Sequence, residues 1–301
     1  MPNSIASKPN MSLMNNPTET AMTKSALCIG INNYPGTHMD LKGCVNDAND
    51  WAAELAARGF AVNKLLDAQA TKAAMVDAFK TLIGGAVSGD VVVVTYSGHG
   101  TYVPDLNGDE IDGLDEGLCP YDLQTGGEAL LDDEIHALFN ARKAGVRLVL
   151  ISDSCHSGTV TRAAAADPDA DEAPRPRFMP MGNWLPANKL PRGASGKPLA
   201  SVAVTSGTSP FVNALSRSVG DLLLAGCKEG PNNFSYDAKI QGRPCGAFTY
   251  YALKALKTLK PTATYADWHA AINPGFLPSA SYPQSPQIVG NAAARKRKIF
   301  A

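Results

Sequence analysis

Two short motifs in the sequence combine a thiol with an imidazole. The segment YSGHG (96–100) places His99 between two glycines, and the segment DSCHSG (153–158) contains Cys155. A thiol within reach of a histidine is the minimum for nucleophilic catalysis by sulfur, because the imidazole can take the thiol proton and later give it to a leaving amine. A lone cysteine is more often a small buried hydrophobe, and a lone histidine a satisfied turn residue. The interpretation therefore depends on the pair.

The elements that must position this pair can be read from recurring apolar runs of strand length. These runs are nearly continuous, which is typical of strands buried on both faces of a mostly parallel sheet. They are SALCIGI (25–31), DVVVVTYS (90–97), VRLVLIS (146–152), ASVAVTS (200–206) and DLLLAG (221–226). Helical patterns lie between and after them, in residues 46–60, 71–85, 132–145, 246–259 and 265–272. The alternation predicts an α/β fold of three layers, with helices flanking a mostly parallel central sheet.

Both chemical residues follow the end of a predicted strand. Cys155 comes 155 − 99 = 56 residues after His99, which leaves room for one crossover helix between neighbouring parallel strands. Because sites in open parallel sheets form at the carboxyl ends of the strands, we expect the two side chains to lie side by side. The backbone amides of Gly100 and Cys155 are candidates for an oxyanion hole.

At this point the chain resembles the caspase-like cysteine peptidases, and most closely the type I metacaspases. The resemblance covers roughly residues 24–290 and includes ALCIGINNY, GCVNDA, NGDEIDGLDE, LLDDEIH, GAFTYYAL and SPQIVG. Asp153 and Ser154 precede Cys155 where true caspases have Gln-Ala, which points to the metacaspase branch. The resemblance implies a caspase-like fold and a cysteine-type endopeptidase that acts on proteins or peptides and requires no cofactor for its chemistry.

The resemblance also implies the substrate preference, because metacaspases cut after Arg or Lys. Asp153 and Asp47 match acidic residues of the pocket that receives this side chain, and Cys44 and Ser97 match other residues of that pocket. A carboxylate beside a thiol raises the pKa of the thiol, which is unfavourable unless the substrate supplies a cation. Two carboxylates around one guanidinium satisfy that condition. Asp47 could instead cap a helix N-terminus.

Calcium is a further expectation from the resemblance, since many metacaspases are activated by this ion. The candidate ligands are Asp115, Asp132 and Asp133, whose hard oxygen atoms suit calcium. Arg162 stands where the family usually has its remaining acidic ligand, and a cation at that position opposes calcium binding. Asp132 and Asp133 could instead interact favourably with a helix dipole.

Two segments fall outside the strand–helix pattern. Residues 1–23 are rich in Asn, Ser, Thr, Pro and Met and are expected to form a flexible tail before a single peptidase domain at 24–301. Residues 163–198 contain seven prolines and are expected to form a long, mobile surface loop. Basic residues in a loop beside a site of basic specificity suggest a zymogen that cleaves itself. They are Arg175, Arg177, Lys189, Arg192 and Lys197.

The composition excludes several classes of partner. The 301 residues include 27 Lys and Arg against 28 Asp and Glu, so the chain offers no charge footprint for nucleic acid or an anionic membrane. No apolar run is long enough to cross a bilayer, and no signal peptide is recognisable. The six cysteines are widely and irregularly spaced, which predicts reduced thiols and a cytoplasmic protein. The resemblance adds the expectation of a monomer. The alternatives are a caspase-fold interaction module without turnover and a caspase-fold peptidase of another specificity.

Overall fold

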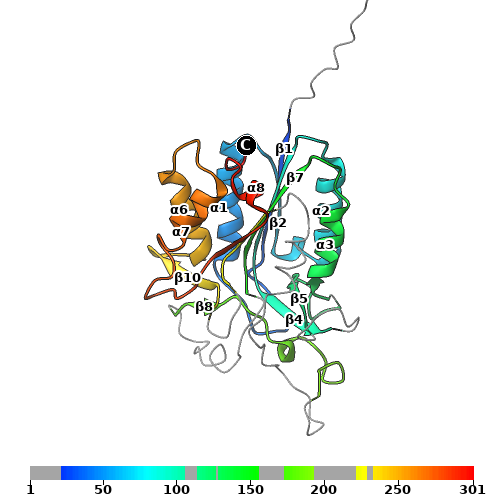
Figure 1. The fold of residues 1–301 in the computed structure, drawn as a ribbon. Helices are drawn as coiled ribbons and strands as arrows, with labels where there is room; N and C mark the ends of the chain where they lie inside the picture. Colours follow the sequence, from blue (N-terminus) through cyan, green and yellow to red (C-terminus); the bar gives the residue numbers. More distant parts are fainter. Residues whose placement is uncertain (1–21, 106–113, 127, 156–172, 193–221, 229–232) are drawn as a thin grey trace, which may run out of the picture.

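A six-stranded sheet forms the centre of the molecule, in the strand order β12-β9-β7-β3-β1-β2 (Figure 1). The computed structural model describes residues 22–105, 114–126, 128–155, 173–192, 222–228 and 233–301. The pairings of β1 with β2 and β3, of β3 with β7 and of β7 with β9 are parallel, and β12 pairs with β9 antiparallel. The strands are β1 (Lys24–Gly30), β2 (Ala61–Leu66), β3 (Val91–Ser97), β7 (Arg147–Asp153), β9 (Leu222–Ala225) and β12 (Gln287–Val289).

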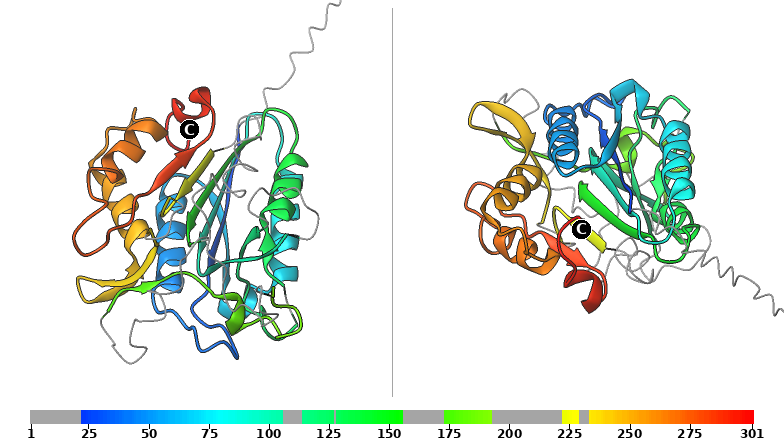
Figure 2. Two further views of the ribbon diagram at one scale, coloured as in Figure 1. Left: turned by 60° about the horizontal axis from the view of Figure 1, so that its bottom comes forward. Right: turned by 90° about the horizontal axis from the view of Figure 1, so that it is seen from above.

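Helices cover both faces of this sheet, which confirms the predicted three-layer α/β architecture (Figures 1 and 2). One face is covered by α2 (Lys72–Gly85) and α3 (Asp132–Asn140). The other face is covered by α1 (Cys44–Ala57), α6 (Ala247–Thr258), α7 (Tyr265–Ile272) and the short α8 (Ala292–Arg295). Among the described helices, none has the length and apolar character needed to cross a membrane.

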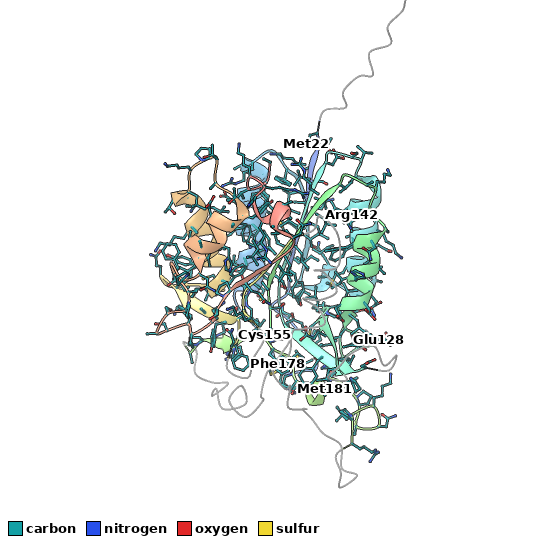
Figure 3. The ribbon with its side chains drawn as sticks, in the orientation of Figure 1. Met22, Glu128, Arg142, Cys155, Phe178 and Met181 are labelled. Atoms are coloured by element: carbon teal, nitrogen blue, oxygen red, sulfur yellow. The ribbon has the colours of Figure 1, made fainter. Side chains whose placement is uncertain are left out.

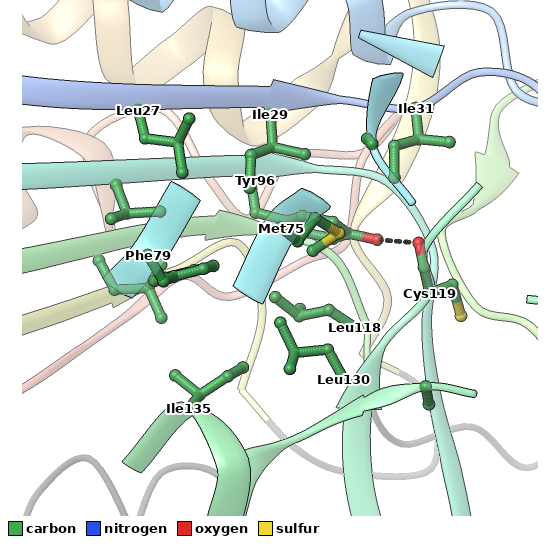
Figure 4. Packing of buried hydrophobic residues seen from close by; sticks show 14 of the residues in the cluster. Leu27, Ile29, Ile31, Met75, Phe79, Tyr96, Leu118, Cys119, Leu130 and Ile135 are labelled. Atoms are coloured by element: carbon green, nitrogen blue, oxygen red, sulfur yellow. Dashed lines mark hydrogen bonds between the residues drawn. The ribbon is translucent and has the colours of Figure 1, made fainter. Parts of the chain in front are cut away.

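Alternate residues of each central strand enter the two cores between the layers. On β3, Val92 and Val94 belong to the core under α2 and α3, whereas Val91 and Val93 belong to the core under α1, α6 and α7. Figure 4 shows part of the first core, which includes Phe79 of α2, Leu27 and Ile29 of β1, and Tyr96 of β3. Burial of each such side chain stabilises the fold by roughly 1.5–3 kcal/mol relative to its exposure. Because both faces of each central strand are buried, the sequence of these strands is continuously apolar and not alternating.

Two small antiparallel sheets lie beyond the carboxyl ends of the central strands, at the bottom of Figure 1. One contains β4 (Gly100–Pro104), β5 (Leu114–Leu118) and β6 (Leu130–Leu131). The other contains β8 (Arg175–Pro176), β10 (Tyr236–Ile240) and β11 (Arg243–Gly246). The sequence patterns did not indicate these short strands, nor β2 and β12, because none of them contains a continuous apolar run like those of the other central strands.

The described part of the proline-rich segment departs from its predicted surface position. Arg177 and Met179 have no exposed surface and Phe178 is 1% exposed, so the prediction of a surface loop is wrong for these residues. The segment is held there because β8 pairs with β10 and Met179 donates its N–H to Gly100 O. Residues 163–172 and 193–198 lie outside the described residues, as do the predicted strand at 200–206 and residues 1–21 of the predicted tail.

Candidate active site

His99 and Cys155 follow two directly hydrogen-bonded strands, as the sequence predicted. In the parallel pairing of β3 with β7, Ser97 lies opposite Asp153, and each candidate residue comes two positions later. Both side chains are buried, with 1% of His99 and none of Cys155 exposed. Figure 3 shows Cys155 at this end of the sheet, beside Phe178. Parallel register therefore brings the imidazole and the thiol to one edge.

The backbone of His99 is held by two tyrosines that sequence reasoning did not single out. Its N–H donates to Tyr34 Oη at 2.8 Å, and its carbonyl accepts from Tyr96 Oη at 2.7 Å. A Cβ atom at Gly98 would lie 2.5 Å from Tyr96 Oη and 2.6 Å from Tyr34 Oη. Glycine is therefore required before His99 because the two hydroxyl groups approach the backbone closely.

The His99 ring has one bonded and one open nitrogen. Nε2 lies 2.6 Å from the carbonyl oxygen of Met39, and Nδ1 has no hydrogen-bond partner among the described residues. Because a carbonyl can only accept, Nε2 must carry the proton and donate it. Burial lowers the pKa of His99 to about 4, against the opposing effect of the Met39 carbonyl. The neutral imidazole thus keeps an unprotonated Nδ1 that can accept a proton.

Cys155 Sγ lies between a backbone amide and a second thiol. The N–H of Ser235 donates to Cys155 Sγ, and Cys227 Sγ lies 3.5 Å away. All six cysteines are free and buried. The sequence contained no signal for Ser235 or Cys227, which lie 80 and 72 residues from Cys155 along the chain. Only the fold brings these groups to the thiol.

Two backbone amides at the strand ends converge on a single carbonyl oxygen. The N–H of Gly100 donates to Arg177 O at 3.0 Å, and the N–H of Cys155 donates to the same oxygen at 3.1 Å. The N–H of Arg177 in turn donates to Ser235 O at 2.8 Å. Two amides aimed at one oxygen form the arrangement that stabilises negative charge on a reacting carbonyl. The sequence analysis proposed the same two amides for an oxyanion hole.

The side chain of Arg177 lies in a buried cluster of three carboxylates. Arg177 Nη2 lies 2.6 Å from Asp47 Oδ2 and 3.0 Å from Asp237 Oδ1, and Nη1 lies 3.2 Å from Asp153 Oδ2. Burial by itself would lower the pKa of Arg177, but the carboxylates raise it well above the usual value, so the guanidinium stays charged. Burial raises the pKa of Asp47 to about 7, although Arg177 opposes this shift. The acidic pocket predicted from Asp47 and Asp153 therefore contains a cation from the same chain.

Backbone donors hold each carboxylate in place. Asp47 accepts from Gly246 N–H at 2.9 Å, and Asp153 accepts from the N–H and hydroxyl of Thr249 at 2.9 and 2.8 Å. The alternative in which Asp47 caps a helix is wrong, because Gly43 is the N-cap of α1 and the first amides of that helix, those of Cys44 and Val45, donate to Asn32 Oδ1. Asp47 instead projects from the first turn of α1 into the pocket.

The other two predicted pocket residues lie at the same place. Cys44 is the first residue of α1 and is fully buried, and burial raises the pKa of its thiol well above the usual value while the charge of Arg177 opposes this. Ser97 is buried at the end of β3, opposite Asp153. All four predicted residues therefore gather at one corner. Asp237 of β10 is the acidic neighbour that sequence reasoning missed.

The candidate calcium ligands lie on the opposite side of the sheet from this pocket. Asp115 is in β5, and Asp132 and Asp133 open α3, which follows directly from β6, the partner of β5. Within the described ranges, no group of three His, Cys, Asp or Glu side chains is arranged to hold a metal ion. Residues 106–113 and Arg162 lie outside those ranges. The described acids therefore do not make a calcium site by themselves.

Comparison with known proteins identifies the family. Residues 24–164 match the family described as metacaspase, peptidase C14 domain. The chain is 31% identical to Metacaspase-1A of Aspergillus oryzae and to Metacaspase-1 of Mycosarcoma maydis, over 88% of its own length and 67% and 69% of theirs. It is 32% identical to Metacaspase-1 of Cryptococcus neoformans, of whose length it spans 62%.

A solved structure agrees with this assignment. The crystal structure of a Geobacter sulfurreducens protein matches with a TM-score of 0.67 at 31% identity, covering 93% of this chain and 98% of that one. Sequence and fold thus lead to the same conclusion, which is that this chain belongs to the metacaspase family.

Proposed function

We propose that the chain is a cysteine endopeptidase that cleaves after basic residues, and that one of its substrates is its own Arg177–Phe178 bond. The observation that carries the proposal is the placement of Arg177. Its side chain lies among three carboxylates, while its carbonyl oxygen accepts from the amides of Gly100 and Cys155, which follow β3 and β7. A substrate residue before a scissile bond needs both contacts at once.

In the proposed reaction, His99 Nδ1 takes the proton of Cys155 and the sulfur attacks the carbonyl carbon of Arg177. The amides of Gly100 and Cys155 hold the resulting oxyanion. His99 then returns the proton to the nitrogen of Phe178, the bond between Arg177 and Phe178 breaks, and Arg177 remains as a thioester on Cys155. Water hydrolyses the thioester, leaving a carboxylate at Arg177 and a free thiol.

The next residue also supports this bond as the substrate. Phe178 lies in an apolar cluster with Tyr102, Met181 and Cys155, and its ring centroid is 5.4 Å from that of Tyr102. Figure 3 shows Phe178 and Met181 near Cys155 at the same end of the molecule. An aromatic side chain fixed on the far side of the bond holds the leaving group in place.

The test is the intact mass of the purified chain after incubation, with calcium or with a chelator. The wild type should give two fragments, residues 1–177 and 178–301. Cys155→Ala and Arg177→Gln should not be cut at this bond. Arg175→Gln is the matched control, because Arg175 lies two residues away and its Nη1 contacts Asp40 O at 3.4 Å, outside the carboxylate cluster. This control should be cut like the wild type.

Two results would count against the proposal. If cleavage stops in Arg175→Gln but continues in Arg177→Gln, the cleaved bond is not the proposed Arg177–Phe178 bond. A wild type that stays intact and also fails to cleave peptides ending in Arg or Lys would favour an interaction module without turnover.

We further propose that calcium activates the chain, with Asp115, Asp132 and Asp133 as the candidate ligands. Comparing the cleavage rate in calcium with the rate in chelator tests this proposal. We also propose that the chain acts as a cytoplasmic monomer, which size-exclusion chromatography can check for the oligomeric state.

A further inference from the structure

Asp237 is the third carboxylate on the guanidinium of Arg177. The two terminal nitrogens of Arg177 divide their contacts, since Nη1 lies by Asp153 and Nη2 bridges Asp47 and Asp237. The three acids come from separate elements, namely β7, α1 and β10. The pocket therefore contacts the guanidinium from several sides, at two distinct nitrogen atoms.

The Asp237 carboxylate is fixed before any cation binds. Its oxygens accept from the N–H groups of Lys42 and Gly43, at 2.8 and 3.0 Å, and the residue is only 5% exposed. Its strand also positions the other partners. In the antiparallel sheet, Asp237 lies opposite Gly246, whose N–H holds Asp47, and opposite Arg175, two residues before Arg177.

The separation of the contacts has a consequence for specificity. Arginine presents a planar group with two terminal nitrogens, whereas lysine presents one compact nitrogen on a flexible stem. A lysine side chain whose single nitrogen takes the place of Nη1, beside Asp153, would lose the contacts that Nη2 makes with Asp47 and Asp237. A buried carboxylate without a close cation is costly, so the third acid disfavours lysine more than arginine.

We propose that Asp237 sets a preference for Arg over Lys at the residue before the cleaved bond. This inference rests on the proposed function and assigns to the same pocket a specificity-determining residue.

The experiment compares self-cleavage at bond 177–178 in four chains, which are the wild type, Arg177→Lys, Asp237→Asn and the double variant. The internal bond serves as substrate, so no external peptide has to displace the chain's own segment. Replacing Arg177 by Lys should slow cleavage about tenfold in the wild-type background, which corresponds to one charged hydrogen bond. In the Asp237→Asn background the same replacement should slow cleavage less than about threefold. Asparagine keeps an oxygen that can accept from Gly43, and this limits the effect on the fold.

Asp50→Asn provides the matched control. Asp50 pairs with Arg243 of β11 on the surface, where both side chains are more than a third exposed, so this variant loses a charge near the same hairpin but outside the pocket. Its ratio of Arg to Lys cleavage should equal that of the wild type. Fluorogenic peptides ending in Arg or Lys, measured on each chain after cleavage, should give the same ratios in kcat/KM, mainly through KM.

The outcomes separate this inference from the function on which it rests. A wild type that cleaves Arg and Lys equally overturns the inference and leaves the peptidase assignment intact. The same follows if Asp237→Asn slows both substrates in equal proportion, because a purely structural role would do so. A wild type that cleaves neither substrate overturns the proposed function itself, and the inference with it.

Discussion

At the scale of single residues, the acidic pocket combines charges that could not be buried separately. An isolated ion inside a protein loses its hydration, and removing one partner of a buried ion pair typically costs about 3–5 kcal/mol. Arg177 balances part of the charge of Asp47, Asp153 and Asp237, and the raised pKa of Asp47 shows that burial still disfavours a third negative charge. The pocket thus strongly favours a cationic occupant.

The buried imidazole of His99 predicts a pH dependence of stability. Folding lowers the pKa of His99 from 6.5 to about 4, mainly by burial, so the unfolded chain binds this proton at a higher pH than the folded chain. The stabilising contribution is therefore fully present above about pH 6.5 and is lost as the pH falls through about 4. The loss amounts to about 3 kcal/mol in the free energy of unfolding.

The measurement is urea unfolding of Cys155→Ala and of Cys155→Ala with His99→Gln, between pH 7 and pH 4. The Cys155→Ala background removes the proposed nucleophile, so that the proposed self-cleavage does not disturb the measurement, and the difference between the two chains cancels the opposite pH dependence of Asp47. The chain with His99 should lose about 3 kcal/mol more than the glutamine variant over this range. Parallel pH profiles of the two chains would contradict the assignment of a buried, neutral His99.

At the scale of elements, the alternation of side chains along each strand decides on which face of the central sheet the pocket lies. On β7, Val149 and Ile151 enter the core under α1, α6 and α7, and Asp153 continues the same alternation beyond them. The carboxylate therefore points to the ends of α1 and α6, where Thr249 donates to it and Arg177 links it to Asp47. A shift of one residue in register would direct Asp153 to the other core.

The junction of β11 and α6 gives a prediction at this scale. Gly246 ends β11, and a Cβ atom there would collide with the Asp153 carboxylate and lie 2.6 Å from Arg177 Nη1. Gly246→Ala should therefore reduce self-cleavage at least about a hundredfold, because a misplacement of about 1 Å can have that effect. Intact mass over time measures the change.

The control for this substitution lies in α2. A Cβ atom at Gly84 would have no atom within 4 Å, so Gly84→Ala should leave cleavage unchanged. It should also raise stability by up to about 1 kcal/mol, because glycine disfavours a helix interior relative to alanine. If Gly246→Ala cleaves itself as fast as Gly84→Ala, the packing at this junction does not control the pocket.

At the scale of the whole molecule, the segment that contains Arg177 occupies the site that we propose for an external substrate. Its backbone pairs with β10 and bonds to Gly100 and Cys155, so a second peptide cannot make these contacts at the same time. We therefore expect the freshly prepared wild type to show a lag before it cleaves peptides ending in Arg, followed by acceleration as bond 177–178 is cut.

The variant Arg177→Gln tests this expectation, because it removes the cation that holds the segment in the pocket. Progress curves with an Arg-ending fluorogenic peptide should show no lag for this chain, whereas Arg175→Gln should retain the lag of the wild type. Linear progress curves of equal initial slope for all three chains would show that the segment does not obstruct external substrates.

The sequence by itself determined the layers of the fold and the edge of the sheet at which the candidate site lies. Continuous apolar runs require strands buried on both faces, and such strands must be covered by helices on each side, so the three-layer α/β architecture followed from local patterns. His99 and Cys155 could be found for the same reason, since each stands directly after one of these runs. Only the parallel pairing of β3 with β7 was needed to predict that the amides of Gly100 and Cys155 lie close together.

The tertiary structure decided which residues from distant parts of the chain complete the site. Asp237 lies 60 residues from Arg177 along the chain, and Ser235 lies 80 residues from Cys155, so no local spacing connects them. The segment around Arg177 indicated a surface loop because it is too polar and proline-rich for a core element. That argument failed because three carboxylates from separate elements compensate the buried charge, and their convergence exists only in the folded chain.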